Sequence, residues 1–418
     1  MNSLIEVVLV GSDLGAFAAA RNLAKAGHKV LVLETAPLQA EGINTLNPVE
    51  PVGIANLNRL SVPFEEKSFK NKTKLISYVD RILGSQTFFL QPLASDSNQV
   101  GQPQGGMFFR SLPVGVVLTD QFLQFLKKLA LAKNARFVSP EAVKICGSSD
   151  EPMITYREEG EKTVEISPDL LVLADLPEGV MDDVKWSNQR SELIRHSFST
   201  PSVLSDSLEL FFDPAVLPNG HIAVLPGRQD TYMTVHTKNG SDEARKLVTD
   251  LLEQKFHQSI VDLSYLGSAT QYKRQPPSEL VSPNHKVVSV GSLTGFTTPM
   301  TQADLLLRLQ TGLVLSDRLS NPTLGETNLL GGPLRSYVEG VQVLQEGVPA
   351  AEELWTSLTA EEVYALGEVL SQKNLTDFSG LVRSWAQLKL FLNPVLRSKR
   401  SQIQEYLCSV LGFSYWSF

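Results

Sequence analysis

Residues 8–16, VLVGSDLGA, form the stretch of the sequence with the clearest chemical meaning. An apolar strand that leads through a glycine turn into a helix is typical of dinucleotide-binding proteins, because the helix N-terminus and the bare glycine backbone hold the pyrophosphate. In the pattern G-x-G-x-x-G/A, Gly11 supplies the tight turn and Ala16 is an allowed last residue. Glu34 ends the next apolar run, where an acidic residue would bind a ribose hydroxyl.

Asp13 occupies the middle position of this pattern, where a glycine normally lets the backbone approach the pyrophosphate. A carboxylate at that point adds bulk and places negative charge beside two phosphates. Aspartate is also an ordinary N-cap residue that interacts favourably with the helix dipole, so it would stabilise an empty turn by itself. We interpret Asp13 as favouring an altered or emptied site over an intact one.

The elements around this motif are predicted from runs of apolar residues. The continuous β-branched runs at 5–10 and 28–34 are typical of parallel strands buried on both faces, and residues 16–26 between them predict a helix. Residues 169–175 (DLLVLAD) predict another buried strand, and residues 285–295 predict a strand with a glycine turn before a long helix. These units together indicate a nucleotide-binding α/β domain.

The rest of the chain has a different pattern. Residues 120–133 predict a helix, and residues 181–285 alternate apolar and polar residues as in an antiparallel sheet, with one helix near 241–256. The last ninety residues read as mostly helical, with a capping box formed by Thr359 and Glu362. We therefore expect a nucleotide-binding domain interrupted by a substrate-type sheet.

Composition narrows the functional classes. The chain has 418 residues, 42% hydrophobic and 20% charged, with a net charge of −8, which argues against broad nucleic-acid binding. Its six histidines have no metal-site spacing, and Cys146 lies far from Cys408, so we expect no metal site and a reducing, cytoplasmic location. We also expect no transmembrane segment, since apolar runs stay well below the roughly 20 residues needed.

Three segments, in this order, resemble the motifs of FAD-dependent oxidoreductases of the geranylgeranyl-reductase type, which are related to aromatic hydroxylases and FixC-like proteins. They are VGSDLGA (10–16), LVLADLP (171–177) and VGSLTGFTTPMTQAD (290–304), and the resemblance spans about residues 5–345. It implies a FAD/NAD(P)-binding Rossmann-like domain with an antiparallel substrate-type sheet and a helical C-terminal extension. It also implies the positions that bound FAD would contact: Gly11, Asp13, Gly15, Ala16, Glu34, Asp175, Gly291, Ser292, Pro299, Gln302 and Asp304.

The departures from the family's pattern lie at ligand-facing positions. They are Asp13, Thr119, Leu176, Ser292, Gln302 and Asp304. Ser292 replaces the aspartate that binds the ribityl chain of FAD in the family, Thr119 stands where an arginine would contact the cofactor, and the others replace glycines. The residues that shape the turns are kept: Gly11, Gly15, Gly291, Gly295, Pro299 and Gly312. This pattern favours a fold retained for another use, with FAD absent or weakly bound.

Two hypotheses about function follow from the resemblance. In the first, the chain is a degenerate flavoprotein, a pseudoenzyme that acts as a binding, chaperone or assembly subunit for a protein partner or an apolar or prenyl ligand. Rab escort and GDP-dissociation-inhibitor proteins resemble this case. In the second, the chain is a working FAD-dependent oxidoreductase that acts on an isoprenoid or other apolar substrate. The sequence names no catalytic residue for either hypothesis.

The expected domain organisation is discontinuous. A Rossmann-like domain is expected to comprise residues 1–85, 111–180 and 286–320; a substrate-type sheet domain, residues 86–110 and 181–285; and a helical region, residues 321–418. The C-terminal tail joins a basic cluster (397–400) to four aromatic residues (413–418), which would suit peripheral membrane or partner contact. The alternative, that the tail folds back on its own domain, is the one we favour.

Overall fold

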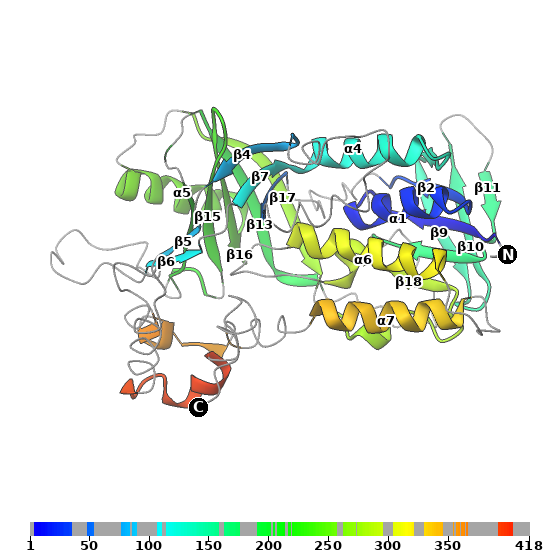
Figure 1. Cartoon of the computed structure of the whole chain (residues 1–418). Helices are drawn as coiled ribbons and strands as arrows, with labels where there is room; N and C mark the ends of the chain where they lie inside the picture. Colours follow the sequence, from blue (N-terminus) through cyan, green and yellow to red (C-terminus); the bar gives the residue numbers. More distant parts are fainter. Residues whose placement is uncertain are drawn as a thin grey trace.

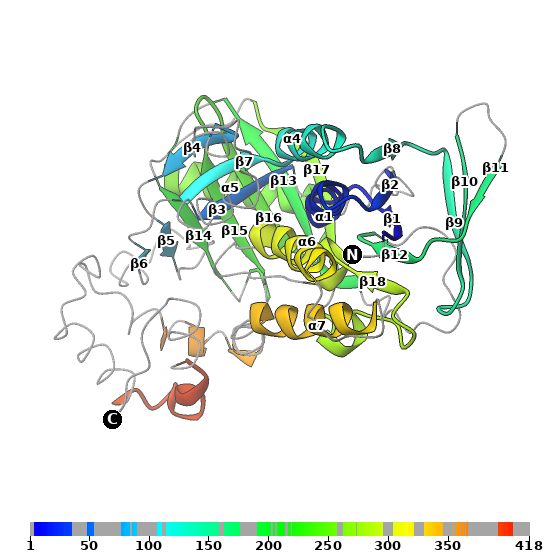
Figure 2. The ribbon, with the colours of Figure 1, turned by 45° about the vertical axis from the view of Figure 1, so that its right-hand side comes forward.

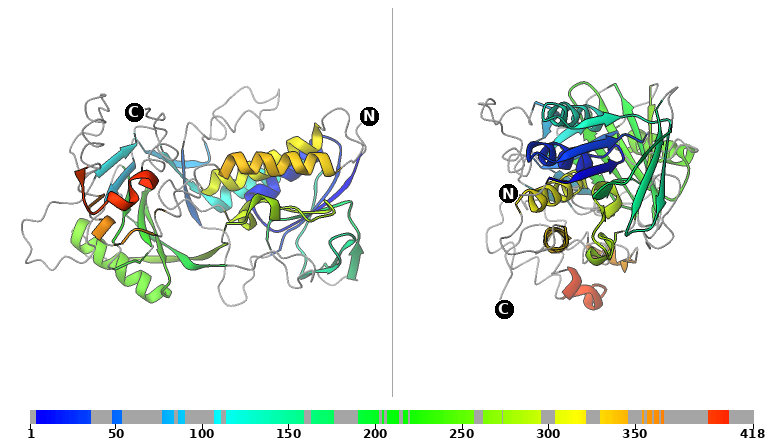
Figure 3. Two further views of the ribbon diagram at one scale, coloured as in Figure 1. Left: turned by 90° about the horizontal axis from the view of Figure 1, so that it is seen from below. Right: turned by 90° about the vertical axis from the view of Figure 1, so that its right-hand side faces the viewer.

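The computed structural model describes about two thirds of the chain. The described residues are 4–35, 48–53, 77–83, 86–89, 107–110, 114–158, 163–175, 190–201, 204, 207–213, 216–218, 220–256, 262–272, 274–295, 304–321, 330–345, 354, 357–359, 361–363, 365–366 and 392–403. They form an elongated molecule with a parallel sheet in one half and a large antiparallel sheet in the other (Figure 3).

A five-stranded parallel sheet organises the first half. Its order is β18 (Val287–Ser289), β12 (Leu170–Leu173), β1 (Glu6–Val10), β2 (Lys29–Leu33) and β8 (Arg136–Val138). The central strands are almost completely buried, as their continuous runs of Val and Leu predict for a sheet that is covered on both faces. The apolar runs of the sequence thus identify the sheet that carries the glycine turn.

Four helices lie side by side on one face of the parallel sheet. Their order is α4 (Thr119–Leu131), α1 (Leu14–Lys25), α6 (Asp304–Ser320) and α7 (Gly331–Gln345) (Figure 1). A small antiparallel sheet of β9 (Ala142–Gly147), β10 (Pro152–Arg157) and β11 (Thr163–Ile166) lies on the opposite side (Figure 2). Apolar residues of this small sheet share one core with the parallel strands, so the half has three layers.

The closest helix pair, α1 with α6, depends on glycine. A Cβ added to Gly312 would lie 1.8 Å from the carbonyl oxygen of Gly15, and one added to Gly15 would lie 2.7 Å from the carbonyl oxygen of Arg308. No side chain fits at such distances, so these two glycines let the helix backbones touch. Gly15 therefore has a packing role in addition to its place in the glycine turn.

The second half contains a seven-stranded sheet with α5 (Ser241–Phe256) packed on it. Its order is β17 (Ser264–Tyr272), β13 (Arg190–Thr200), β16 (Thr231–Thr237), β15 (His221–Pro226), β14 (Leu208–Phe211), β5 (Gln86–Phe89) and β6 (Met107–Arg110). All pairings are antiparallel except the one between β14 and β5. The alternating pattern of the sequence predicts this sheet.

A three-stranded sheet connects the two halves. It has the order β3 (Val49–Gly53), β7 (Val114–Leu118) and β4 (Val79–Leu83). Val49 and Val116 share a core with the seven-stranded sheet, whereas Val52 and Val117 pack into the core beneath the helices. This placement lets residues of β3 reach both halves.

The described part of the C-terminal region packs against the seven-stranded sheet. Leu354, Leu358 and Leu396 are buried in the same core as strands β14 and β15. The predicted capping box is confirmed: Thr359 N donates to Glu362 Oε2 at 2.8 Å, and Glu362 N donates to Thr359 Oγ1 at 3.2 Å. Within the described ranges, no helix has the length and apolar character that crossing a membrane requires.

The structure confirms the predicted α/β fold class, a Rossmann-like parallel sheet joined to an antiparallel sheet. The exact domain boundaries stay a prediction. Several positions singled out in the sequence lie outside the described residues: Leu176, Pro299, Gln302, Cys408 and the aromatic tail 413–418.

Candidate functional site

The glycine turn lies at the carboxyl end of β1, beside the end of β12. Gly11 has a φ of +117°, and a Cβ added there would lie 2.8 Å from the backbone nitrogen of Asp175. Its own N–H donates to the carbonyl of Leu33 at 3.0 Å. Glycine is therefore required at this position for the chain to turn between two adjacent parallel strands. Ala16, the last residue of the motif, lies in the first turn of α1 and is fully buried in the core beneath the helices.

Asp13 is the N-cap of α1 and is only 2% exposed. Its Oδ1 accepts a hydrogen bond from Gly15 N at 2.7 Å. Its Oδ2 accepts from Ser292 Oγ at 2.7 Å and from Ser292 N at 3.3 Å. Two departures from the family's pattern, 279 residues apart, are thus in direct contact.

Gly291 makes room for this contact. It begins the short 3-10 helix η2 (Gly291–Thr294) with a φ of +62°. A Cβ added to Gly291 would lie 1.7 Å from Asp13 Oδ1, so the carboxyl group fills the space beside the glycine. The N–H of Gly291 donates to Thr311 Oγ1 at 2.8 Å. The junction between α1 and η2 is therefore closed by protein atoms.

The electrostatic surroundings of Asp13 act in opposite directions. The pKa of Asp13 lies above its ordinary value, because burial raises it by more than the Arg308 guanidinium and the hydrogen bonds from Ser292 and Gly15 lower it. The two backbone partners are N–H donors, which bind the unprotonated oxygens of the carboxyl group and so favour its ionised form. Asp13 is thus a buried acidic group that accepts three hydrogen bonds, from Gly15 N, Ser292 N and Ser292 Oγ.

Glu34, the predicted ribose ligand, follows β2 and binds protein groups. Lys127 Nζ lies 2.6 Å from Glu34 Oε2 and 2.8 Å from Oε1, and Ser139 Oγ donates to Oε2 at 2.9 Å. The Glu34 side chain is 13% exposed. Its carboxylate therefore already has a cation and a hydroxyl donor from α4 and the loop after β8.

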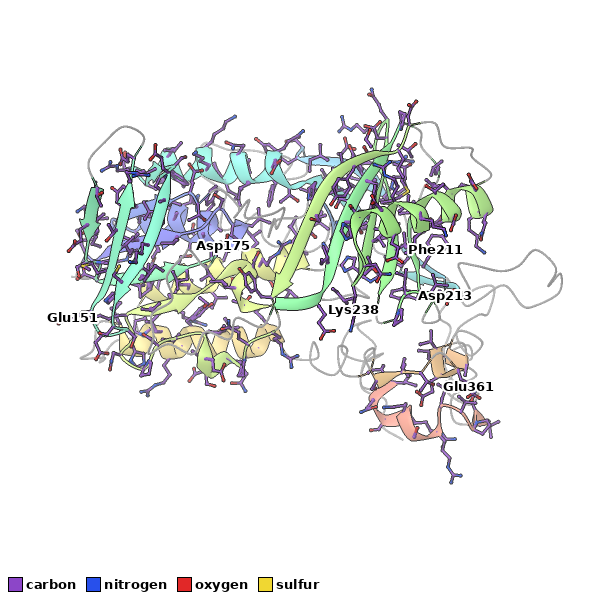
Figure 4. The ribbon with its side chains drawn as sticks, turned by 180° about the vertical axis from the view of Figure 1, so that it is seen from behind. Glu151, Asp175, Phe211, Asp213, Lys238 and Glu361 are labelled. Carbon is purple, nitrogen blue, oxygen red and sulfur yellow. The ribbon has the colours of Figure 1, made fainter. Side chains whose placement is uncertain are left out.

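Other predicted positions lie near the same end of the parallel sheet. Asp175 follows β12 and accepts a hydrogen bond from Tyr272 Oη at 3.0 Å. It lies in the half of the molecule that holds the parallel sheet (Figure 4). Thr119 begins α4, is fully buried, and its hydroxyl has no hydrogen-bond partner in the described structure. Asp304 begins α6.

A buried ionic chain continues from this junction into the antiparallel sheet. Arg308 of α6 and Arg195 of β13 both pair with Glu50 of β3, and the Arg195 Nη1–Glu50 Oε2 distance is 3.2 Å. Arg195 Nε in turn donates to His236 Nε2 at 2.6 Å, and His236 stacks on His221 with ring centroids 3.9 Å apart. All five residues are at most 4% exposed.

Glu50, Arg195 and Arg308 were not predicted as a group from the sequence. The available signal was a single charge within an otherwise apolar run, as in LLLRL (305–309), because a buried charge needs a partner. Burial lowers the pKa of His236 well below its ordinary value, and His221, Arg195 and His196 add to the effect. His236 is therefore a neutral acceptor for Arg195.

No group of ligating side chains that could hold a metal ion occurs among the described residues. His28 lies at the turn between α1 and β2, and His221 and His236 lie on strands β15 and β16 of the antiparallel sheet. His28 accepts from the N–H of Ile5 at 3.4 Å. These contacts are structural.

Comparison with solved structures identifies the fold. A geranylgeranyl bacteriochlorophyll reductase-like protein from Thermoplasma acidophilum matches over 96% of this chain and 99% of its own, with a TM-score of 0.68 and 15% identity. The chain has the fold of the FAD-dependent oxidoreductases. The flavin-dependent brominase Bmp2 matches over 97% of this chain and 99% of its own (TM-score 0.62, 14% identity), and the flavin-dependent halogenase CmlS over 94% and 78% (0.58, 14%).

No protein-family model and no curated protein sequence matches the chain. At identities of 13–15%, structural neighbours establish the shared fold rather than a shared reaction.

Proposed function

We propose that this FAD-dependent-oxidoreductase-fold protein does not work as a flavoenzyme and instead acts as a binding or assembly subunit for a protein partner or an apolar ligand. The observation that carries the proposal is the position of the Asp13 carboxyl group. It lies at the N-terminus of α1, where this fold class binds a dinucleotide pyrophosphate.

Four backbone N–H groups around this turn already bind protein atoms. The N–H groups of Gly15 and Ser292 bind Asp13, the N–H of Gly291 binds Thr311, and the N–H of Gly11 binds Leu33. A phosphate at this turn would have to displace a buried carboxyl group and then meet its charge. The residues present therefore do not fit a pyrophosphate in this arrangement.

The ribose end supports the same proposal. Glu34 binds Lys127 and Ser139, and a ribose hydroxyl would compete with an ammonium group for its oxygens. Thr119, which the family resemblance places opposite the cofactor, offers a neutral hydroxyl in place of a guanidinium. Loss of favourable contacts at both ends would weaken FAD binding in addition to the steric effect of Asp13.

The visible absorbance of the purified protein tests the proposal. We expect a colourless protein after gel filtration, with a melting temperature that does not change when excess FAD is added. Stoichiometric bound flavin would overturn the proposal and support the alternative, an active FAD-dependent oxidoreductase acting on an isoprenoid or other apolar substrate.

A double variant tests the assigned cause. Asp13→Gly combined with Ser292→Asp removes the internal carboxyl group and restores the family's acidic residue beside η2. We expect this variant, unlike the native protein, to melt at a higher temperature when FAD is present. Asp150→Gly removes an exposed aspartate on the same half of the molecule and serves as the matched control. A response of the control to FAD would show that the effect is not specific to the junction.

A further inference from the structure

The environment of the Asp13 carboxyl group is that of a bound anion. Two backbone N–H groups and one hydroxyl donate to its two oxygens at 2.7–3.3 Å, from elements that are far apart in the sequence. A helix N-terminus together with such donors is a common anion site in proteins. Here the anion is supplied by the chain itself.

Arg308 provides a second, independent reason for an anion at this point. Its guanidinium is 4% exposed; its Nη1 lies 3.5 Å from Ser292 Oγ, and its Nη2 pairs with Glu50 Oε1. Glu50 also pairs with Arg195, so one carboxylate contacts two buried guanidiniums. Asp13 adds a second carboxyl group beside Arg308, so acidic and basic side chains alternate from α1 to β13.

We propose that the Asp13 carboxyl group is the built-in occupant of a small anion-binding site, and that the site binds a free monocarboxylate once that occupant is removed. This inference rests on the proposed function, because it explains what fills the turn in place of a pyrophosphate. The site is formed by Gly15 N–H, Ser292 N–H and Oγ–H, with Arg308 supplying the positive charge. The expected ligand is a small carboxylate ion of the same size as the part of the Asp13 side chain that a substitution removes.

Two substitutions empty the site to different extents. Asp13→Ala removes the atoms of a formate ion, whereas Asp13→Gly removes the atoms of an acetate ion. The N-cap of α1 has extended backbone angles (φ −133°, ψ 153°), which both replacements can adopt. We expect formate to raise the melting temperature of the Ala variant more than acetate does, and acetate to be at least as effective as formate for the Gly variant.

The size of the effect follows from ligand linkage. A ligand present at ten times its Kd increases the ratio of folded to unfolded protein about elevenfold. Chloride at the same ionic strength is the salt control, and native protein and Asp13→Asn, in which the position stays filled, are the protein controls. Asp13→Ala combined with Ser292→Ala removes one donor, and we expect its response to formate to be weaker.

Equal stabilisation by formate, acetate and chloride, or the same response in native protein, would overturn the inference. If the variants do not fold in chloride, the yield of folded protein after refolding in formate compared with chloride provides the same test. The two proposals fail separately. Bound flavin in the native protein would overturn the proposed function, whereas a missing formate response in a flavin-free variant would overturn only the anion site.

Discussion

The contact between Asp13 and the residues after β18 predicts energetic coupling between positions 13 and 291. Gly291→Ala places a Cβ 1.7 Å from the present position of Asp13 Oδ1, so the carboxyl group must move away from Ser292. Asp13→Gly removes the same carboxyl group directly. Because both substitutions abolish the same contacts, the double variant loses them only once.

The magnitude can be worked out from these contacts. Two hydrogen bonds from Ser292 to a charged group contribute about 1.5 kcal/mol each at the lower end of the usual range, or about 3 kcal/mol together. Glycine is a tolerable N-cap, so Asp13→Gly should cost about 3 kcal/mol in total. Gly291→Ala adds left-handed backbone strain of about 1–2 kcal/mol, for a cost of about 4–5 kcal/mol.

The double variant should therefore be destabilised by about 4–5 kcal/mol, against about 7–8 kcal/mol if the effects were additive, a coupling of about 3 kcal/mol. Urea unfolding of the native protein, both single variants and the double variant measures this cycle. Gly240→Ala, at a position with no neighbour within 4 Å, should be additive with Asp13→Gly. Additivity to within about 0.5 kcal/mol at position 291 would show that the carboxyl group does not lie beside Gly291.

Three further predictions concern the interior. Glu50→Gln removes the carboxylate that two buried guanidiniums share and should lower the free energy of unfolding by about 3–5 kcal/mol. Glu141→Gln, in an exposed ion pair, should cost at most about 1 kcal/mol in urea unfolding. The pKa of His236 is lowered in the native state, so unfolded chains take up a proton there that native protein does not. As the pH drops below 6.5, His236 alone should lower the free energy of unfolding by at most about 1.4 kcal/mol per pH unit, and the pH dependence of urea unfolding should be less steep in His236→Gln. Gly312→Ala should destabilise by about 1–3 kcal/mol in thermal unfolding despite its better helix propensity, because the new Cβ meets Gly15 O; a stabilised variant would contradict this.

The parts of the fold that depend on residues close together in the sequence were predictable from it. Buried strands appear as continuous apolar runs, and the box of Thr359 and Glu362 needs only two residues three positions apart. The glycine turn was also predictable, because the positive φ of Gly11 follows from a local motif. The packing role of Gly15 and Gly312 was not, since it depends on how closely two helices approach after the chain has folded.

The candidate site shows the same limit more sharply. From the sequence, Asp13 and Ser292 are two independent departures from the family's pattern. Asp13 is bulkier than the family's glycine, and Ser292 is shorter than the family's aspartate. In the structure each explains the other, because the serine hydroxyl and N–H bind the aspartate that fills the turn. Arg308 and Glu50, which pair across 258 residues, had no local pattern that could connect them. Taken residue by residue, the motif shows only two departures from the family's pattern, whereas the structure shows that Ser292 donates two hydrogen bonds to the Asp13 carboxyl group. Asp13→Gly alone should empty the turn but leave Ser292 without its acceptor, whereas the paired change should also place an acidic residue beside η2, so we expect only the pair to respond to FAD.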